Sequence, residues 1–492
     1  MDSYVPPWNT GSQIDSLSDR HYADVIIIGG GISGLSLAWR LMQLAPALRI
    51  KVFEAGDRPG GTAWTDYENG FLIEHGANGF LANKTSTWNL VWELGLANEL
   101  AVANQAARYR YVLDKRGLYL LPNGLWSLIR FPLLSWQAKW AILTEYWRHS
   151  VSYKDDESVY EFVSRRTNRE VADLIAELLV TGIYAGNPHE LSMAACFPRV
   201  AEMERRSGSV TAGFFQECRE RKRQHQQHPQ APVKRSQLYS LRRGMRQLIE
   251  ALAQRLAPIL HLASPVHRIE YLVSDTTRRW RVSCRETTWH CRELVLACPA
   301  YVQAQLLEPL CSELAREVKT IPYVPIAVIA LGYRQNQLGK RCVGFGYLTT
   351  WRSQSRMLGA QWCSCIFPDR APDGHILMRY MAGGSRWLRV LEQPDDFLVS
   401  EAHQEASRLF AIQGTPCYSK VIRWPRAIPQ YTLGHKKRLA TIRNLLSRWP
   451  GLHLTGNAYE GVSLNDCVER SNQLAIHLAR LVNAVLATQD SA

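Results

Sequence analysis

The sequence predicts an α/β fold that begins with a β-strand, an α-helix and a second β-strand. Three observations predict this unit. The apolar stretch Asp24 to Ile28 runs directly into three glycines, a helical pattern covers Leu35 to Leu44, and "RIKVFE" (Arg49 to Glu54) has the composition of a second strand. An apolar strand, a glycine turn, a helix of period 3.6 and another strand, in this order, are typical of a parallel βαβ unit.

The composition indicates a large folded protein with an anionic partner. The chain has 492 residues, of which 46% are hydrophobic and 21% charged, so we expect two or three domains and no general disorder. The formal net charge of +14 favours nucleic acid, an acidic membrane surface or a carboxylate substrate as the partner. A basic surface without a specific partner is the alternative.

The cysteine pattern and the N-terminus indicate the cellular compartment in which the protein is expected. The 11 cysteines contain no C-x-x-C pair, so we expect neither a disulfide framework nor a zinc site, and a reducing compartment. Residues 1–22 are polar and lack an apolar core, which predicts a flexible tail and no secretory signal. The chain has no run of 18 apolar residues, so we expect no membrane-spanning helix.

The glycines after the first strand fit a dinucleotide-binding turn. Gly29, Gly31 and Gly34 match G-x-G-x-x-G, and Glu54 ends the second strand 20 residues after the last of them. The first glycine allows the tight turn, the second lets a pyrophosphate approach the backbone, and the third lets the helix pack on the strand. An acid at this spacing is expected to hold the ribose hydroxyls. The sequence therefore predicts a Rossmann-like nucleotide site.

The residues after Glu54 favour FAD over NAD. "EAGDRPGGTAWT" (Glu54 to Thr65) resembles the flavin motif of amine oxidase-like flavoproteins, with Arg58, Gly60 and Gly61 at the places of the arginine and the glycine pair. An arginine there can offset phosphate charge.

Two later stretches differ from the rest of the chain. Leu118 to Trp147 is rich in Leu, Trp and Phe and is broken by prolines; it predicts either buried core helices or a segment at a membrane interface. Glu217 to Gln237 is polar, basic and without periodicity, which predicts an exposed loop. We do not expect this loop to bind nucleic acid, because no aromatic residues are interleaved with its charges.

Further elements are expected towards the C-terminus. The apolar spacing of Met245 to Leu256 predicts a helix, and "SPVHRIEYL" and "RELVLACPA" predict strands. The last unit is a short strand, a Gly-Asn turn at Gly456 and a long helix.

Several stretches together resemble the protoporphyrinogen oxidase family of amine oxidase-like flavoproteins. They occur in the family's order and cover about residues 23–486. The stretches are "GFLIEHGANGFL" (70–81), "TGIYAGNPHELSMAACFPRV" (181–200), "GFGYL" (344–348), "FPDRAPDG" (367–374), "RWPRAIPQYTLGH" (423–435) and "GNAYEGVSLNDCVER" (456–470). Two departures occur: Gly76-Ala77 replaces the usual Gly-Pro, and Ser463-Leu464 stands where small or β-branched residues are frequent.

The resemblance implies an FAD domain of the p-hydroxybenzoate hydroxylase type, a substrate domain with a mixed sheet, and a helical part that docks on a membrane. The implied boundaries are 23–82, 237–300 and 425–492 for the FAD domain, 83–117, 200–236 and 301–424 for the substrate domain, and 118–199 for the helical part.

The resemblance also assigns residues to a non-covalent FAD. Asn78 is implied to lie near the flavin, with a structural role in a turn as the alternative. The implied FAD contacts are Gly29, Gly31, Ile32, Ser33, Gly34, Glu54, Ala55, Arg58, Gly60, Gly61, Gly76, Ala77, Asn78, Gly79, Val266, Trp424, Val462, Ser463 and Leu464. The helix expected just after Leu464 would direct its N-terminal dipole at negative charge on the reduced flavin.

For the substrate, the resemblance places Arg110 on a propionate, with Arg108 as the competing residue. Trp362 is implied to stack on a tetrapyrrole, with core packing as the alternative, and Ile329 and Phe345 to sandwich its rings. Gly344 would leave room for the ring edge. No metal ligands stand out.

The implied activity is the six-electron oxidation of protoporphyrinogen IX, with O2 as acceptor and H2O2 as product. Coproporphyrinogen III oxidation on the same fold is the nearest alternative; an amine oxidase, a carotenoid desaturase or a non-catalytic flavin protein are more distant ones. The expected partners are the substrate, O2, a membrane surface, ferrochelatase and a second copy of the chain, with no nucleic acid. We expect a cytoplasmic protein attached peripherally to a membrane.

Overall fold

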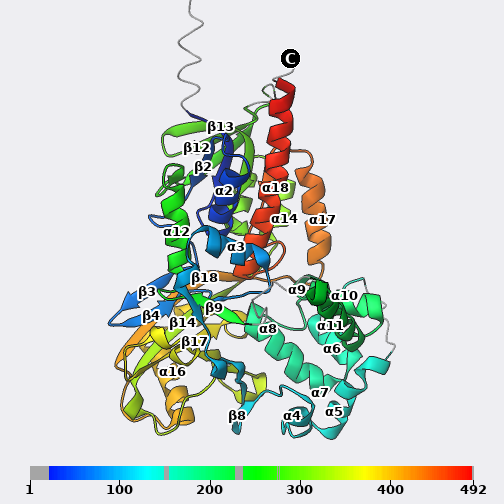
Figure 1. The fold of residues 1–492 in the computed structure, drawn as a ribbon, viewed down its shortest axis with the longest axis vertical. Coiled ribbons are helices and arrows are strands. Elements are labelled where there is room, and N and C mark those ends of the chain that lie inside the picture. Colours follow the sequence, from blue (N-terminus) through cyan, green and yellow to red (C-terminus); the bar gives the residue numbers. More distant parts are fainter. Residues whose placement is uncertain (1–20, 149–154, 228–236, 274, 276–277, 490–492) are drawn as a thin grey trace, which may run out of the picture.

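The computed structural model describes residues 21–148, 155–227, 237–273, 275 and 278–489. The tail expected over residues 1–22 lies outside the described residues up to position 20, and Tyr22 already begins the first strand. Two large sheets follow one another along the long axis, and a group of helices lies beside the second sheet (Figure 1).

The predicted βαβ unit is present. It consists of β1 (Tyr22–Ile28), α2 (Ile32–Leu44) and β2 (Ile50–Phe53). The two strands are parallel, with Ile27 opposite Val52. Every residue of β1 is buried, as expected for a parallel strand covered on both faces. The helix begins directly after Gly31, three residues before the first periodic apolar residue.

The first sheet gathers strands from distant parts of the chain. Its order is β10-β2-β1-β13-β12-β11, with β19 paired to β13. The remaining strands are β10 (Leu260–His261), β11 (Val266–Tyr271), β12 (Trp280–Cys284), β13 (Thr287–Leu296) and β19 (Leu452–Leu454). Because β13 runs parallel to both β1 and β19, it joins the N-terminal and C-terminal parts of the sheet.

Helices cover both faces of the first sheet. Val25 and Ile27 of β1 face one group of helices, whereas Ile26 and Ile28 face another. The first group is α2, α3 (Thr85–Glu93), α12 (Arg246–Leu256) and α18 (Leu464–Gln489). The second group is α13 (Ala300–Leu307), α14 (Ser312–Lys319) and α17 (His435–Leu446). The helices expected over 245–256 and after the C-terminal turn are thus confirmed.

The second sheet is mixed. Its order is β18-β14-β17-β16-β15-β7-β8, and β15 is parallel to β7 while the other pairs are antiparallel. Its strands are β7 (Arg110–Asp114), β8 (Gly117–Leu120), β14 (Tyr323–Arg334), β15 (Gly346–Thr349), β16 (Met357–Trp362), β17 (His375–Gly383) and β18 (Tyr418–Pro429).

The two faces of the second sheet have different neighbours. Ala327 and Ile329 of β14 point towards α16 (Asp395–Phe410), which covers one face. Val328 and Ala330 point to the opposite face, where the hairpin of β3 (Thr65–Glu68) and β4 (Phe71–Glu74) packs. A small sheet of β5 (Phe80–Leu81), β9 (Leu238–Leu241) and β6 (Leu100–Val102) and the short helix α15 (Cys363–Ile366) lie between the two large sheets.

The helical part is held together by a buried ion pair. Arg166 Nε donates to Glu145 at 2.8 Å, and the same carboxylate accepts the N–H groups of Val210 and Thr211. The helices are α4 (Leu125–Ile129), α5 (Trp136–Leu143), α6 (Val159–Arg166), α7 (Arg169–Val171), the π-helical segment Ala172–Ala176, α8 (Glu177–Tyr184), α9 (Met193–Cys196), α10 (Pro198–Ser207) and α11 (Val210–Gln227). Residues 200–227, assigned above to the substrate domain, therefore pack on the helical part; the domain boundaries stay predictions.

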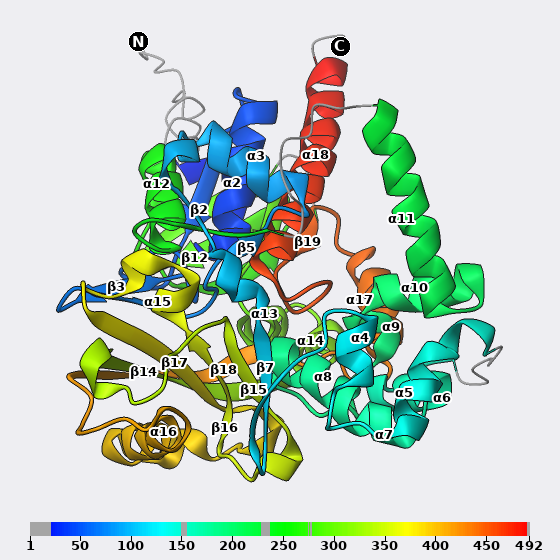
Figure 2. The ribbon, with the colours of Figure 1, turned by 60° about the horizontal axis from the view of Figure 1, so that its bottom comes forward.

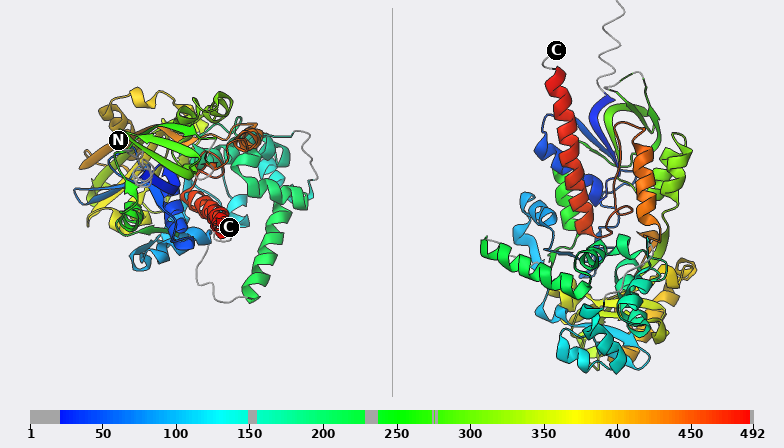
Figure 3. Two further views of the ribbon diagram at one scale, coloured as in Figure 1. Left: turned by 90° about the horizontal axis from the view of Figure 1, so that it is seen from above. Right: turned by 90° about the vertical axis from the view of Figure 1, so that its right-hand side faces the viewer.

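The loop predicted over 217–237 is wrong in its first half. α11 continues to Gln227 and extends away from the body of the molecule (Figures 2 and 3), while residues 228–236 lie outside the described residues. Arg, Lys, Glu and Gln are good helix formers. The missing apolar period reflects a helix without a packed face and does not indicate a loop.

The aromatic stretch 118–147 divides between core and surface. Phe131 and Leu134 are buried in a core with α8, whereas Trp126, Trp136 and Trp140 are 75%, 71% and 68% exposed. The expectation of buried core helices therefore holds for part of the stretch, and the membrane interface stays a prediction. Among the described helices, none has the length and apolar character that a bilayer crossing requires.

Candidate functional site

The turn after β1 has the backbone that a pyrophosphate site needs. Gly29 has φ +115°, and a Cβ on Gly34 would lie 1.9 Å from the Gly29 carbonyl oxygen. A Cβ on Gly31 would meet nothing within 4 Å. The first and third glycines are thus required by the protein itself, while the second leaves open space at the start of α2, where free N–H groups favour an anion.

Glu54 is fixed beside this turn. Its carboxylate accepts the Gly30 N–H at 2.7 Å and the Gly56 N–H at 2.8 Å. The Glu54 carbonyl accepts the Ser264 N–H at 2.7 Å, which places the start of β11, at Val266, next to the same segment. An acid held in this way is suited to accept hydrogen bonds from the ribose hydroxyls of a dinucleotide.

The glycine pair lies against the glycine-rich turn. The Gly60 N–H donates to the Gly30 carbonyl at 2.8 Å, and Gly31 and Gly60 form an isolated parallel bridge. Arg58 lies over the Trp64 ring, 4.3 Å from its centroid, and donates to the Gly61 carbonyl. The predicted residues from the two motifs therefore meet. Ile32 and Ser33 form the first turn of α2, and Ala55 follows Glu54.

The segment from Gly76 to Gly79 approaches other backbone closely. A Cβ on Gly76 would lie 2.4 Å from the Thr62 carbonyl oxygen, and one on Gly79 would lie 2.3 Å from that of Tyr239. Trp424 of β18 donates through Nε1 to the His75 carbonyl at 3.2 Å. Ala77 lies between these contacts. This segment, Gly76–Gly79, is called the floor segment below.

Asn78 of the floor segment has no hydrogen-bond partner among the described residues. It is 8% exposed, and neither its amide nitrogen nor its amide oxygen has a hydrogen-bond partner. A buried amide left unpaired costs about 1–3 kcal/mol. Such a group indicates a ligand that supplies the missing hydrogen bonds, and FAD above the floor segment fits this requirement.

The start of α18 borders the floor segment. Ser463 accepts the Asp466 N–H at 3.2 Å through its hydroxyl, and Val462 and Leu464 flank it. Asn465 donates to the Leu81 carbonyl at 2.7 Å, which ties the helix start to β5, directly after the floor segment. The helix begins at Leu464, slightly earlier than expected, and its N-terminal end carries partial positive charge.

The substrate residues meet at one end of the second sheet. Arg110 begins β7, and its guanidinium lies 4.7 Å from the centroid of the Phe345 ring. The Phe345 N–H donates to the Tyr109 carbonyl at 2.8 Å. Gly344 has φ +135°, and a Cβ there would lie 2.8 Å from the same carbonyl oxygen and 3.0 Å from the Trp362 ring. Gly344 is therefore required for this close packing.

The Arg110 guanidinium is available for a ligand. Among the described residues, it has no ion-pair or hydrogen-bond partner, and its side chain is exposed. The surrounding protein nevertheless desolvates it and lowers its pKa. Arg108, in contrast, donates to the Tyr109 hydroxyl at 2.8 Å. The arrangement favours Arg110 for a carboxylate.

Trp362 borders Gly344 from the core side, but neither Trp362 nor Ile329 points to the site. Both point towards α16, where they are 2% and 0% exposed and pack in its core. Trp362 lies at the edge of Phe410, with ring centroids 5.4 Å apart. The structure thus places both in the core, the alternative given for Trp362, and offers no support for a contact with substrate.

Three residues that point to the site side, Arg379, Gln361 and Gly346, were missed. Arg379, Gln361, Gly346 and Arg110 lie opposite one another on β17, β16, β15 and β7. Residues directly opposite in a sheet point to the same face, here the face away from α16. Because side chains alternate along a strand, Gln361 points to the face opposite that of Trp362 and could have been considered from the sequence. The pairing of the strands could not be read from it.

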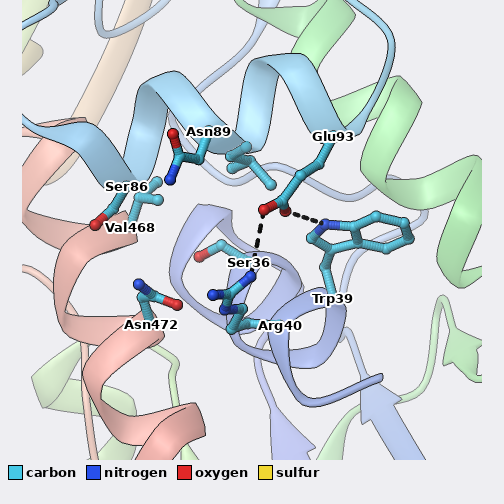
Figure 4. A pocket seen from close by; sticks show the side chains of 9 residues that line it. Ser36, Trp39, Arg40, Ser86, Asn89, Glu93, Val468 and Asn472 are labelled. Atoms are coloured by element: carbon cyan, nitrogen blue, oxygen red, sulfur yellow. Dashed lines mark hydrogen bonds and ion pairs between the residues drawn. The ribbon is translucent and has the colours of Figure 1, made fainter. Parts of the chain in front are cut away.

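A further pocket lies elsewhere, between α2, α3 and α18. Trp39 and Arg40 both contact Glu93, at 3.1 and 3.3 Å (Figure 4). These contacts join α2 to α3, and none of the predicted site residues lines the pocket. Among the described residues, no group of three or more His, Cys, Asp or Glu side chains could hold a metal ion.

Comparison with known proteins agrees with the site. The family model "flavin containing amine oxidoreductase" matches residues 32–475. Protoporphyrinogen oxidase 1 of Arabidopsis thaliana is 33% identical over 92% of this chain and 88% of its own length. Human protoporphyrinogen oxidase is 33% identical over 92% and 97%. Coproporphyrinogen III oxidase of Bacillus subtilis is 27% identical over 91% and 96%.

Solved structures share the fold. A protein from Exiguobacterium superimposes with a TM-score of 0.78, at 24% identity over 92% of this chain and 98% of its own. Putrescine oxidase bound to putrescine gives a TM-score of 0.68, at 15% identity over 93% and 99%.

Proposed function

The chain belongs to the flavin-containing amine oxidoreductase family, and on this premise we propose that it is an FAD-dependent protoporphyrinogen IX oxidase. The reaction removes six electrons and six protons from the substrate. With three O2 as acceptors, it yields protoporphyrin IX and three H2O2. The relatives named protoporphyrinogen oxidase support this substrate.

The observation that carries the proposal is the buried, unpartnered Asn78 in the floor segment, at a site built around the open Gly31. Glu54 would hold the ribose, Arg58 would offset phosphate charge, and the start of α18 would face the pyrimidine end of the flavin. Bound FAD supplies the two-electron chemistry that the side chains lack.

The substrate is positioned by the chain's own residues. Arg110 would pair with a propionate through its planar fork of N–H donors. Gly346 lies next to it, and a Cβ there would come within 2.0 Å of the Ala360 carbonyl oxygen. This strand therefore presents no side chain to the site at that point. A wide, largely apolar macrocycle fits such a surface, and the enzyme's task is to hold one carbon of it near the flavin.

Coproporphyrinogen III is the second candidate substrate, because the Bacillus subtilis relative carries that name. The experiment is anaerobic mixing of the purified protein with each porphyrinogen while the flavin absorbance is followed. Rapid bleaching by protoporphyrinogen and slow bleaching by coproporphyrinogen are expected. The reverse order would reassign the substrate, and no bleaching by either would leave an amine oxidase, a desaturase or a non-catalytic flavin protein.

The helical part is proposed as a membrane-docking surface. Trp126, Trp136 and Trp140 are exposed on α4 and α5, and Arg130, at the end of α4, is exposed as well. Aromatic and basic residues together suit the headgroup region of a bilayer. The p-hydroxybenzoate hydroxylase type of the FAD domain, ferrochelatase and a second copy as partners, and a cytoplasmic, peripherally attached location remain predictions.

A further inference from the structure

Arg379 is a buried cation without a carboxylate partner. It is 5% exposed. Its Nη2 donates to the Gly76 carbonyl at 2.7 Å and its Nη1 to Gln361 Oε1 at 3.4 Å, while Nε has no partner. Among the described residues, no carboxylate lies within ion-pair distance of it. Burial lowers the pKa of this guanidinium, yet arginine stays protonated in proteins.

The neighbouring charges leave this cation uncompensated. Glu74 lies 3.8 Å from Arg370, and both are almost fully buried. The Glu74 carboxylate also accepts the Thr65 hydroxyl at 2.6 Å and the Met245 N–H at 2.9 Å. The single carboxylate of Glu74 acts on both Arg370 and Arg379, so these three groups keep one uncompensated positive charge. A buried charge of this kind is costly unless an anion balances it.

The position of Arg379 identifies which anion it faces. It holds the carbonyl of Gly76, the first residue of the floor segment, two residues before the unpartnered Asn78. Arg110 lies three strands away in the same row, which corresponds to about 14 Å. The substrate carboxylates belong at Arg110, so Arg379 serves the cofactor end of the site.

We propose that Arg379 is a positioning residue for the flavin, whose charge favours the reduced cofactor and raises its reduction potential. The inference rests on the FAD site of the proposed function. A flavin that takes up two electrons and one proton carries one negative charge. A fixed cation beneath it, in a water-excluded place, stabilises that charge more than water would. The contact with Gly76 also holds the floor segment in place.

The test is the midpoint potential of the flavin in the purified holoenzyme, measured by spectroelectrochemistry without substrate. R379M removes the charge and keeps an apolar chain of similar length. We expect the equilibrium constant for two-electron reduction to fall at least tenfold, which is about 30 mV. R379K should retain most of the parent potential. R356M is the matched control, because Arg356 precedes β16 but pairs with Glu401 of α16, on the other face.

The outcomes separate a charge effect from a structural one. An unchanged potential in R379M would overturn the proposal, as would an equal drop in R356M. If R379M does not retain FAD, R379Q takes its place and must show the same drop. Loss of FAD from both neutral variants but not from R379K would support a charge-dependent role, whereas loss from all three would overturn it. Because no porphyrinogen is used, a flavoprotein with another substrate would still give a valid result.

Discussion

The Arg110 guanidinium lies over the Phe345 ring, 4.7 Å from its centroid, where β7 and the segment before β15 meet. Stacking on an aromatic face holds the side chain in place. It leaves the N–H groups of the guanidinium free for a ligand. This pair is the basis of the first prediction.

Replacing Arg110 by Ala should lower kcat/KM for protoporphyrinogen by roughly 10- to 100-fold, because a charge-assisted fork is worth about 1.5–3 kcal/mol. FAD content should not change. Arg110→Lys should recover only part of the activity, since a point charge cannot form the fork. Steady-state kinetics on the holoenzyme measure both.

Arg108→Ala is the matched control for this prediction. Arg108 donates to Tyr109 and should contribute little to turnover. A large loss of kcat/KM for Arg108→Ala, with no loss for Arg110→Ala, would assign the propionate to Arg108 instead. No loss for either would place the pocket elsewhere.

Gly31→Ala should impair FAD binding, whereas Gly34→Ala should impair the stability of the fold. Gly31 has open space around its Cβ position, so the Ala variant should fold with near-parent thermal stability but bind FAD poorly. A Cβ on Gly34 would collide with the Gly29 carbonyl, so that variant should lose stability itself. Thermal unfolding of the apoproteins and FAD titration distinguish the two; tight FAD binding by Gly31→Ala would contradict the site.

FAD is predicted to be non-covalent. Denaturing the yellow holoprotein with acid or heat should release all flavin absorbance into the supernatant, because the contacts proposed above are hydrogen bonds and packing. Flavin remaining with the precipitated chain, or a purified protein without colour, would refute the prediction.

Changing Trp126, Trp136 and Trp140 together to Ser should weaken binding to anionic lipid vesicles at least about tenfold, a loss of 1.4 kcal/mol or more. Phe131 is left intact because it is buried in the core. Vesicle co-sedimentation measures the effect. Trp92→Ser on α3 is the control, since Trp92 is also exposed but lies outside the helical part; equal binding of the triple variant and the parent would rule out this surface.

The folded state should lose stability as pH decreases, because His435 is buried in its neutral form. Its ring stacks on Tyr431 with centroids 4.3 Å apart, and Nε2 lies 3.0 Å from the Tyr459 carbonyl. Nδ1 has no partner in the part of the chain that the structure describes. Burial lowers its pKa to about 4, whereas the unfolded value is about 6.5. Only the unfolded chain takes up this proton between those values, so stability is lost as pH falls from 6.5 towards 4.

The expected loss from this group between pH 7.5 and 5.0 is about 2 kcal/mol, at 1.36 kcal/mol per pH unit below 6.5. His435→Phe keeps the stack and removes the titration. Its thermal midpoint should therefore fall less than that of the parent over this range. An equal fall in both proteins would assign the pH dependence to other groups.

The sequence by itself determined the nucleotide end of this protein. The glycine turn, Glu54 and the glycine pair lie close together along the chain, and their spacing reports backbone constraints that the structure bears out. Gly29 has a positive φ, and Gly34 contacts the Gly29 carbonyl. Local propensity and period likewise predicted β1, α2, α12 and α18.

Only the tertiary structure determined which residues face the substrate end of the site. Whether Trp362 or Gln361 faces the site depends on which face of β16 is covered by α16, and no local pattern reports that. Arg379 looks like an isolated charge in an apolar strand until β17 pairs with β16 and Gly76 comes within hydrogen-bond distance. The path of α11 was also not predictable, because only its start packs, against α10, and its largely exposed remainder leaves no apolar period in the sequence.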